Sequence, residues 1–131
     1  MIIGQYNKTE VYEGLCEWWE KHKFPVLDID FLPETFFTVE VGEEVLYGMF
    51  VYRTDSKLAW IAFPISNPDL TKEEKKGGLE FLINGITEIL KESGFKYIFT
   101  TSPLPVVQEA LLNTGFNLGD EKANHYLKKI V

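Results

Sequence analysis

Two adjacent lysines and two adjacent glycines, Lys75, Lys76, Gly77 and Gly78, have the types and spacing to bind a phosphate group. Lysine supplies positive charge, and glycine lets the backbone approach a ligand closely. In front of a helix, such a turn also offers backbone N–H groups and the positive end of the helix dipole to an anion. The segment is therefore a candidate anion site.

A helix cap is the alternative interpretation of the same segment. Thr71 is followed three residues later by Glu74, the spacing at which two side chains reciprocally cap the first turn of a helix. The helix would then begin at about Lys72 and contain Gly77 and Gly78, each of which costs about 1 kcal/mol relative to alanine. The glutamates of this turn would complement the positive helix end and repel a phosphate. The sequence leaves open whether the glycines lie in a loop or inside the helix.

The elements that position this segment are predicted to be a strand, a helix and a second strand. Residues 58–65 form an almost continuous apolar run, typical of a strand buried on both faces of a sheet. Apolar residues then recur at spacings of three and four from Leu79 to Leu90, Gly94 follows as a helix cap, and residues 96–101 are rich in aromatic and β-branched types. Because no short hairpin can join the two strands, a βαβ crossover with a parallel pair is predicted.

The rest of the chain is predicted to extend this unit on both sides. Before it we expect a strand at residues 1–6, a helix capped by Thr9 that stops before Pro25, and antiparallel strands at residues 36–41 and 45–52. Residues 26–32 alternate in polarity and could be a short strand or an irregular loop. After it we expect a short helix over residues 106–111, a possible strand at 116–118 and a last strand at 125–130.

Length and composition predict one domain over residues 1–131, since 131 residues with 45% hydrophobic content can bury a substantial core. There is no run of about 20 apolar residues and no signal-peptide pattern, so no membrane span and a cytoplasmic location are expected. The single cysteine and the two isolated histidines exclude an internal disulfide and a Cys or His metal site.

Charge also limits the partners. The formal net charge is −7 and Arg53 is the only arginine, which argues against nucleic acid, because phosphate binding needs an excess of Lys and Arg. An acidic patch that could attract a cationic amine or a basic partner is predicted from Asp28, Asp30, Glu34, Glu40, Glu43 and Glu44. The alternative is a solvated face that aids solubility.

The order of the predicted elements, the helix followed by Gly115-Phe116 and the final strand pair resemble the GNAT-type N-acetyltransferases. Leu32-Pro33, the stretch 52–61 and Ser66-Asn67-Pro68 further resemble small GNAT-like proteins encoded by bacteriophages. The resemblance implies a single α/β (α+β) domain with a mixed, mostly antiparallel sheet, a parallel, splayed βαβ pair and helices on both faces. It also implies that acetyl-CoA lies in the cleft between residues 58–65 and 96–101 and that an acetyl group is transferred to an amine.

The resemblance implies a cofactor-binding segment between residues 65 and 78. The family binds the pyrophosphate with a basic-x-x-Gly-x-Gly/Ala loop, and the closest match here is Glu74-x-x-Gly77-x-Leu79, with an acid and a leucine at two motif positions. The residues expected to hold acetyl-CoA are Ile65, Ser66, Asn67, Lys75, Lys76, Gly77 and Gly78. For Asn67, the alternative is a simple turn with Pro68.

The resemblance also directs attention to proton donors. The family often places a catalytic tyrosine four residues before the Gly-Phe pair, which is Leu111 here. Tyr126 and Ser102 are the candidate substitute acids, and Glu40 could act as a base through water. The alternative for Tyr126 is packing with its hydroxyl at the surface, and for Glu40 it is a surface residue.

Two functions follow from these residues. The first is an acetyl-CoA-dependent N-acetyltransferase that acts on a small amine or a protein amine. The second is a GNAT-fold protein without catalysis that works as a binding module, directed at a host protein in the host cytoplasm if it is phage-encoded. The departures at Glu74, Leu79 and Leu111 favour the second function.

Overall fold

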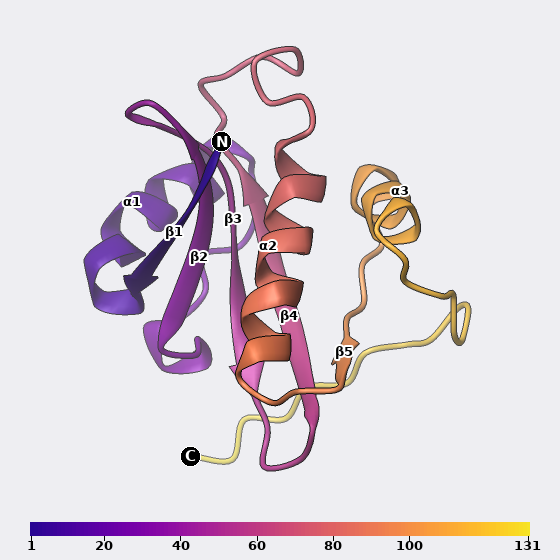
Figure 1. Ribbon diagram of the computed structural model, residues 1–131. Coiled ribbons are helices and arrows are strands. Elements are labelled where there is room, and N and C mark those ends of the chain that lie inside the picture. The colour runs from indigo at the N-terminus through magenta and orange to yellow at the C-terminus, as the bar shows by residue number, and fades with distance from the viewer.

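The computed structural model describes residues 1–131 (Figure 1). The strands are β1 (Ile2–Asn7), β2 (Thr35–Val41), β3 (Glu44–Arg53), β4 (Leu58–Ser66) and β5 (Tyr97–Phe99). The α-helices are α1 (Lys8–Lys21), α2 (Gly78–Glu92) and α3 (Pro105–Asn113), and a short 3₁₀ helix, η1 (Ile29–Phe31), precedes β2.

The five strands form one sheet whose spatial order, β1-β2-β3-β4-β5, is also their order in the chain. The first four are antiparallel and β4 pairs with β5 in parallel. One core, which includes Phe37, Val51 and Leu82, joins the sheet to α2 and α3, and a smaller core around Trp19 and Phe50 joins the other face to α1. The predicted mixed sheet with a parallel βαβ pair and helices on both faces is confirmed.

β4 changes character part-way along its length. Only Leu58, Ala59 and Trp60 pair with β5, so the rest of β4 has β3 as its one neighbouring strand. Phe63 has a φ of 54°, and the register between β4 and β3 shifts at this point. β4 therefore has a bulge here, with one extra residue relative to β3. Pro64 has no N–H to donate, and proline is tolerated where a strand has a free edge or a bulge. The predicted splay between β4 and β5 is present beyond Trp60.

The segment before α2 combines both sequence interpretations. The predicted capping box forms, since Thr71 N–H donates to Glu74 Oε1 (2.9 Å) and Glu74 N–H donates to Thr71 Oγ1 (3.2 Å). It caps hydrogen-bonded turns, and α2 itself begins at Gly78 after Gly77 adopts a left-handed conformation with φ of 78°. The predicted helix start at Lys72 is therefore wrong, because Gly77 interrupts the helical backbone.

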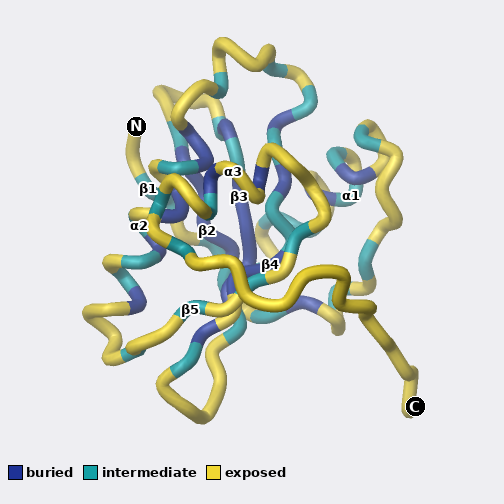
Figure 2. Tube along the Cα trace, turned by 90° about the vertical axis from the view of Figure 1, so that its right-hand side faces the viewer, coloured by how far each residue is buried: buried dark blue, intermediate teal, exposed yellow.

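The helix cap at Thr9 and the tail strands were predicted wrongly, and the alternative left open for residues 26–32 is decided. α1 is capped by Asn7 instead of Thr9, because Asn7 Oδ1 accepts the Thr9 N–H (3.0 Å) and Glu10 caps the Asn7 N–H in return. Of the two alternatives for residues 26–32 the irregular loop is the one found; it contains the 3₁₀ helix η1, and Leu32 is buried as an anchor. The predicted strands at residues 116–118 and 125–130 do not form, and residues 117–131 are exposed (Figure 2).

The absence of tail strands follows from their neighbours. A strand gains stability from cross-strand pairs and a covered face. β5 contains three residues and pairs with β4 only at Leu58–Trp60, so this end of the sheet offers a tail strand little to pair with. The alternation in the tail sequence is a weak local preference that nothing in the structure reinforces.

Candidate functional site

The point where β4 and β5 part is the first component of the candidate site. Trp60 and Phe99 are the last paired residues, and Thr100 Oγ1 donates a hydrogen bond of 2.8 Å to the carbonyl oxygen of Ile61 immediately beyond them. A small cavity opens here towards α2 and α3. It is lined mainly by apolar residues, namely Met49, Ile61, Ala62, Pro64, Ile83, Thr100, Val107 and Leu111.

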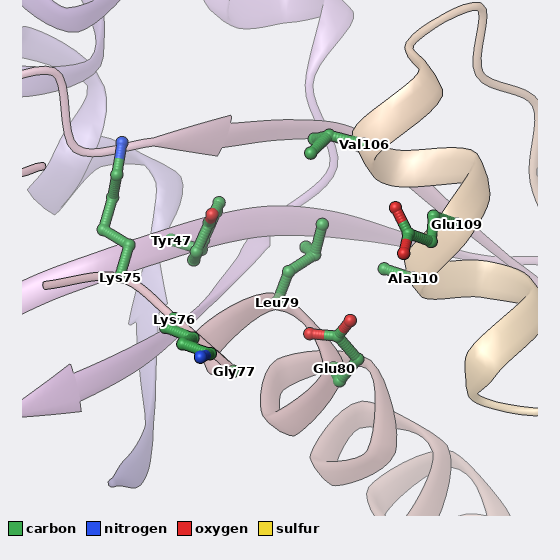
Figure 3. A pocket seen from close by; sticks show the side chains of 9 residues that line it. All are labelled: Tyr47, Lys75, Lys76, Gly77, Leu79, Glu80, Val106, Glu109 and Ala110. Atoms are coloured by element: carbon green, nitrogen blue, oxygen red, sulfur yellow. The ribbon is translucent and has the colours of Figure 1, made fainter. Parts of the chain in front are cut away.

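A second cavity of about 140 Å³ lies between the start of α2 and α3 (Figure 3). Its lining comes from β3, the loop before α2, α2 and α3, and consists of Tyr47, Lys75, Lys76, Gly77, Leu79, Glu80, Val106, Glu109 and Ala110. Both cavities touch α2 and α3, and Val106 and Val107 line one cavity each. The two hollows are therefore separate but lie on the same side of the sheet, each bordered by α2 and α3.

The start of α2 presents free hydrogen-bond donors at the second cavity. The N–H groups of Leu79 and Glu80 have no acceptor within the chain, and no side chain caps this helix. A β-carbon on Gly78 would lie 3.0 Å from the Tyr47 ring, so glycine is needed for this close approach. Together with the helix dipole, these donors favour an anion at this end of α2.

The lysines beside these donors differ in their surroundings. Lys75 Nζ donates to the carbonyl oxygen of Asn67 (3.2 Å) and lies 5.8 Å from the centre of the Tyr47 ring, and its partial burial lowers the pKa of Lys75. Lys76 is exposed at the cavity. Lys75 therefore supports the loop, and Lys76 is the lysine free to meet a ligand.

Two carboxylates oppose an anion in the same cavity. Glu80 on α2 and Glu109 on α3 both project into it (Figure 3). Burial, followed by the charge of Glu80, raises the pKa of Tyr47. The electrostatic balance is therefore set by Lys76 and the helix end on one side and by the two glutamates on the other.

The predicted cofactor residues do not all meet in this cavity. Lys75, Lys76 and Gly77 line it, and Gly78 follows directly at the first position of α2. Ile65 packs in the core beneath α1. Ser66 accepts a hydrogen bond from His22 Nε2 (2.8 Å) through its carbonyl oxygen.

Asn67 is a buried turn residue. Its side-chain amide donates to the carbonyl oxygen of Val45 (2.8 Å), and its side-chain oxygen accepts the Asp69 N–H (3.0 Å). With Lys75 held on its backbone oxygen, Asn67 ties the start of β3 to the loop before α2. Asn67 therefore supports the loop before α2.

The candidate proton donors lie outside both cavities. Ser102 Oγ accepts the N–H of Leu104 (3.2 Å) at the start of α3, and Tyr126 is 90% exposed in the C-terminal tail. Leu111 lines the cavity at the splay. Glu40 accepts hydrogen bonds from Tyr6 (2.8 Å) and Thr38 on the α1 face of the sheet. That bond to Glu40 is also the main cause of the raised pKa of Tyr6.

Sequence reasoning missed Thr100, Glu80 and Glu109 as site residues. Pro64 was a signal that went unused, because proline inside an apolar run indicates a strand with a free edge. The predicted acidic patch is divided in space, since Asp28, Asp30 and Glu34 precede β2, and Glu40, Glu43 and Glu44 lie at its other end. No group of three or more His, Cys, Asp or Glu side chains gathers where it could ligate a metal ion. None of the α-helices has the length and apolar composition to cross a membrane.

Comparison with solved structures places this arrangement among known folds. The aminoglycoside acetyltransferase meta-AAC0020 from an uncultured soil metagenomic sample, solved with sisomicin, superposes with a TM-score of 0.70 at 15% identity, over 98% of this chain and 95% of that chain. The aminoglycoside N-acetyltransferase AAC(6')-Iy with CoA gives 0.66 at 17% identity, over 98% and 100%. The chain has the GNAT fold.

The ribosomal-protein-S18-alanine N-acetyltransferase from Escherichia coli gives a further match, with a TM-score of 0.69 at 12% identity over 91% of this chain and 80% of that chain. No protein-family profile matches the sequence, and no curated protein is significantly similar to it. At these identities the GNAT fold is shared, and the activities named are those of the other proteins.

Proposed function

We propose that this GNAT-fold protein is an acetyl-CoA-dependent N-acetyltransferase. The observation that carries the proposal is the parting of β4 from β5 at Trp60 and Phe99, with a cavity at that point and a second one at the start of α2. Its structural neighbours include acetyltransferases with different named substrates, and one was solved with CoA. Fold alone does not fix activity, so the site must carry the rest.

The residues at the start of α2 fit the phosphate end of acetyl-CoA. The unpartnered N–H groups of Leu79 and Glu80 and the ammonium of Lys76 are donors for a pyrophosphate. Gly77 leaves room for a ligand, because a β-carbon there would meet nothing closer than 4.0 Å. Repulsion from Glu80 and Glu109 opposes the same group, so weak cofactor affinity is expected.

The residues at the splay have the apolar character that the thioester end needs, and the cavity of about 10 Å³ there would have to widen on binding. Acetyl-CoA supplies an activated acyl group, and the acceptor amine must be neutral to attack it. Met49, Ile61 and Leu111 give the cavity at the splay an apolar lining. Since Leu111 has no proton to give, we propose that the leaving thiolate takes its proton from the acceptor nitrogen, which becomes acidic once it has attacked the thioester. Ser102 and Tyr126 remain candidate donors only if their surroundings change on binding.

The acceptor is an amine, either on a small molecule or on a protein. We further propose that the protein is cytoplasmic, where its one cysteine, Cys16, would stay reduced. We also propose that the protein is encoded by a bacteriophage, because Leu32-Pro33, residues 52–61 and Ser66-Asn67-Pro68 resemble phage-encoded GNAT-like proteins.

A catalytically inactive GNAT-fold binding module is the second candidate. Glu80 and Glu109 favour it, because they stand where the cofactor phosphates would lie. The two functions differ in whether acetyl-CoA binds the folded protein.

Thermal unfolding with and without acetyl-CoA tests the proposal. A ligand that binds only the folded state adds about 2.7 kcal/mol to the free energy of unfolding at a concentration of 100 Kd. We expect a rise in Tm that K76E reduces and K72E leaves unchanged, because Lys72 is an exposed lysine of the same loop outside the cavity. No rise at millimolar acetyl-CoA would reject the transferase and leave the binding module. If Tm rises, release of free CoA thiol in the presence of a panel of amines tests transfer itself.

A further inference from the structure

Five aromatic side chains form a continuous row on the α1 face of the sheet. Their ring centres follow one another at 6.0 Å from Phe31 to Phe63, 6.3 Å to Tyr52, 6.1 Å to Trp60 and 5.5 Å to Phe99. We call these residues the aromatic row. Three of the rings are 40% to 48% exposed, namely Phe31, Trp60 and Phe99. Such contiguous exposed apolar surface often marks a binding site.

Strand alternation fixes which face carries the aromatic row. Val51, Ala59 and Ile61 point into the core under α2, so their neighbours Tyr52 and Trp60 point to the opposite face. α1 packs against another part of that face, around Phe36 and Ile65. The aromatic row is therefore the part of this face that α1 leaves uncovered.

The aromatic row lies at the splay. Trp60 and Phe99 are the last paired residues of β4 and β5, and Phe63 belongs to the bulge just beyond them. The apolar cavity on the opposite face is lined by Ile61, Ala62 and Pro64 of the same strand. A molecule on the aromatic row and a group in that cavity would thus approach the same stretch of β4 from the two faces of the sheet.

Charge at one end of the aromatic row indicates the sign of its ligand. Asp28 and Asp30 precede Phe31, before and within η1; both are exposed and neither takes part in an ion pair, although Asp28 Oδ1 accepts the Asp30 N–H (2.9 Å). The ammonium group of Lys8 donates hydrogen bonds to the carbonyl oxygens of Ile29 and Leu32 in this segment. Its Nζ lies 3.8 Å from Glu34 Oε1, so its charge is paired with Glu34. The tyrosine of the row pins the segment to the sheet, because Tyr52 Oη donates to the carbonyl oxygen of Phe31 (2.6 Å).

No cation forms a salt bridge with Asp28 or Asp30. Arg53 follows Tyr52 in β3 and therefore points to the opposite face of the sheet. Lys57 lies in the turn between β3 and β4. Aromatic faces attract cations within about 6 Å of the ring centre, and the attraction is strongest for tryptophan. A row of exposed rings that ends at a segment with two carboxylates outside any ion pair suits a ligand that has both a flat apolar body and a positive charge.

We propose that the aromatic row binds a small cationic amine with a flat apolar body, which the proposed transferase takes as its acceptor. The acceptor role rests on the proposed function, and the binding itself does not. The flat body stacks on Trp60 and its neighbours, and the ammonium group faces Asp28 and Asp30.

Binding of 2-phenylethylamine, measured without cofactor, tests the proposal. In ¹⁵N-edited NMR titrations we expect it to shift the indole N–H of Trp60 and the backbone of η1. The neutral 2-phenylethanol, which has the same ring, should bind at least fivefold more weakly, and salt should weaken the amine because exposed charges are screened. Equal affinity for the amine and the alcohol would overturn the charge selection.

Variants assign the site. W60L should weaken 2-phenylethylamine at least fivefold and D30N at least twofold, whereas F81A and E43Q should leave its affinity unchanged. Phe81 is an aromatic residue of similar exposure (39%) on α2, and Glu43 is an exposed carboxylate at the far end of β2. Because W60L could perturb folding, D30N at an exposed position is the second variant. Unchanged affinity in D30N and in folded W60L would overturn the site.

The outcomes separate this proposal from the proposed function. Amine binding without any acetyl-CoA binding supports the aromatic row as an amine site and overturns the transferase. Acetyl-CoA binding with no amine binding at the row overturns the row alone. Self-association through the row, seen as a dimer that W60L abolishes, would also overturn it, since a second copy would then be the occupant.

Discussion

Thr100 Oγ1 donates a 2.8 Å hydrogen bond to the carbonyl oxygen of Ile61, immediately after the last paired residues of β4 and β5. A side chain thus replaces the backbone ladder where the two strands part. The bond holds β4 and the end of β5 together beside the apolar cavity, which both residues line.

Replacing Thr100 with valine should lower the free energy of unfolding by about 1 kcal/mol, because it leaves the buried Ile61 carbonyl without its donor at nearly constant volume. Thr100→Ser keeps the hydroxyl and should lose less. Urea unfolding measures both. Equal stability of the valine variant and the wild type would show that the bond contributes nothing.

Neutralising the two carboxylates of the α2 cavity should tighten CoA binding. Removing Glu80 and Glu109 as E80Q and E109Q takes away negative charge where the pyrophosphate is proposed to lie, so we expect a gain of roughly threefold for each, largest at low salt. Isothermal titration calorimetry with CoA measures it, and E88Q on the exposed side of α2 is the control. Weaker binding by E80Q and E109Q would move the phosphates elsewhere.

The capping box before α2 should make stability depend on acid pH. The hydrogen bond from the backbone N–H of Thr71 is the main cause of a pKa of Glu74 below its ordinary value of 4.5, and the Thr71 hydroxyl adds to it. The folded state therefore holds fewer protons, and the stability that Glu74 contributes is present above pH 4.5 and lost as pH falls through the folded value. The stability difference between wild type and E74Q should accordingly shrink below pH 4.5 in unfolding titrations. A constant difference would contradict the assignment.

Two helix glycines should respond oppositely to alanine. In Gly85→Ala on α2 the new β-carbon would lie 2.6 Å from Ile3 Cγ1, so overpacking of about 1–3 kcal/mol should exceed the helix-propensity gain of about 1 kcal/mol. In Gly14→Ala on α1 nothing lies within 4 Å, so a gain of about 0.5–1 kcal/mol is expected.

A double-mutant cycle identifies the cause. In an Ile3→Ala background the contact partner is gone, and Gly85→Ala should become neutral or stabilising. If Gly85→Ala costs the same in both backgrounds, the close approach of β1 and α2 is not the reason for the glycine. Chemical unfolding of the four proteins is sufficient for this comparison.

Sequence patterns predicted the fold where local and tertiary preferences agree. The stripe from Leu79 to Leu90 is both helix-forming and buried, and the run at residues 58–65 forms a strand whose α2 face is buried, although Trp60 on its other face is 40% exposed and the predicted burial on both faces is wrong. The pattern at residues 125–130 has the local preference without a partner strand, and its strand is absent. Strand formation depends on a neighbour, which a local pattern does not contain.

The site was harder to predict for a related reason. Lys75 and Lys76 are adjacent in sequence, yet one is bound to Asn67 and the other is free. Glu80 and Glu109 are 29 positions apart and meet only because α3 packs against α2. Which charges share a cavity is decided by helix packing, so composition could suggest an anion site but not the carboxylates that oppose it.

The identity between strand order and chain order has a consequence for folding kinetics. β2, β3 and β4 are joined by short turns, so their pairing closes small loops at little entropic cost, while β1 and β5 must wait for α1 and α2 to span longer segments. The three-strand meander is thus the natural nucleus. Substitutions within it should slow folding, and substitutions in β5 or α3 should mainly speed unfolding.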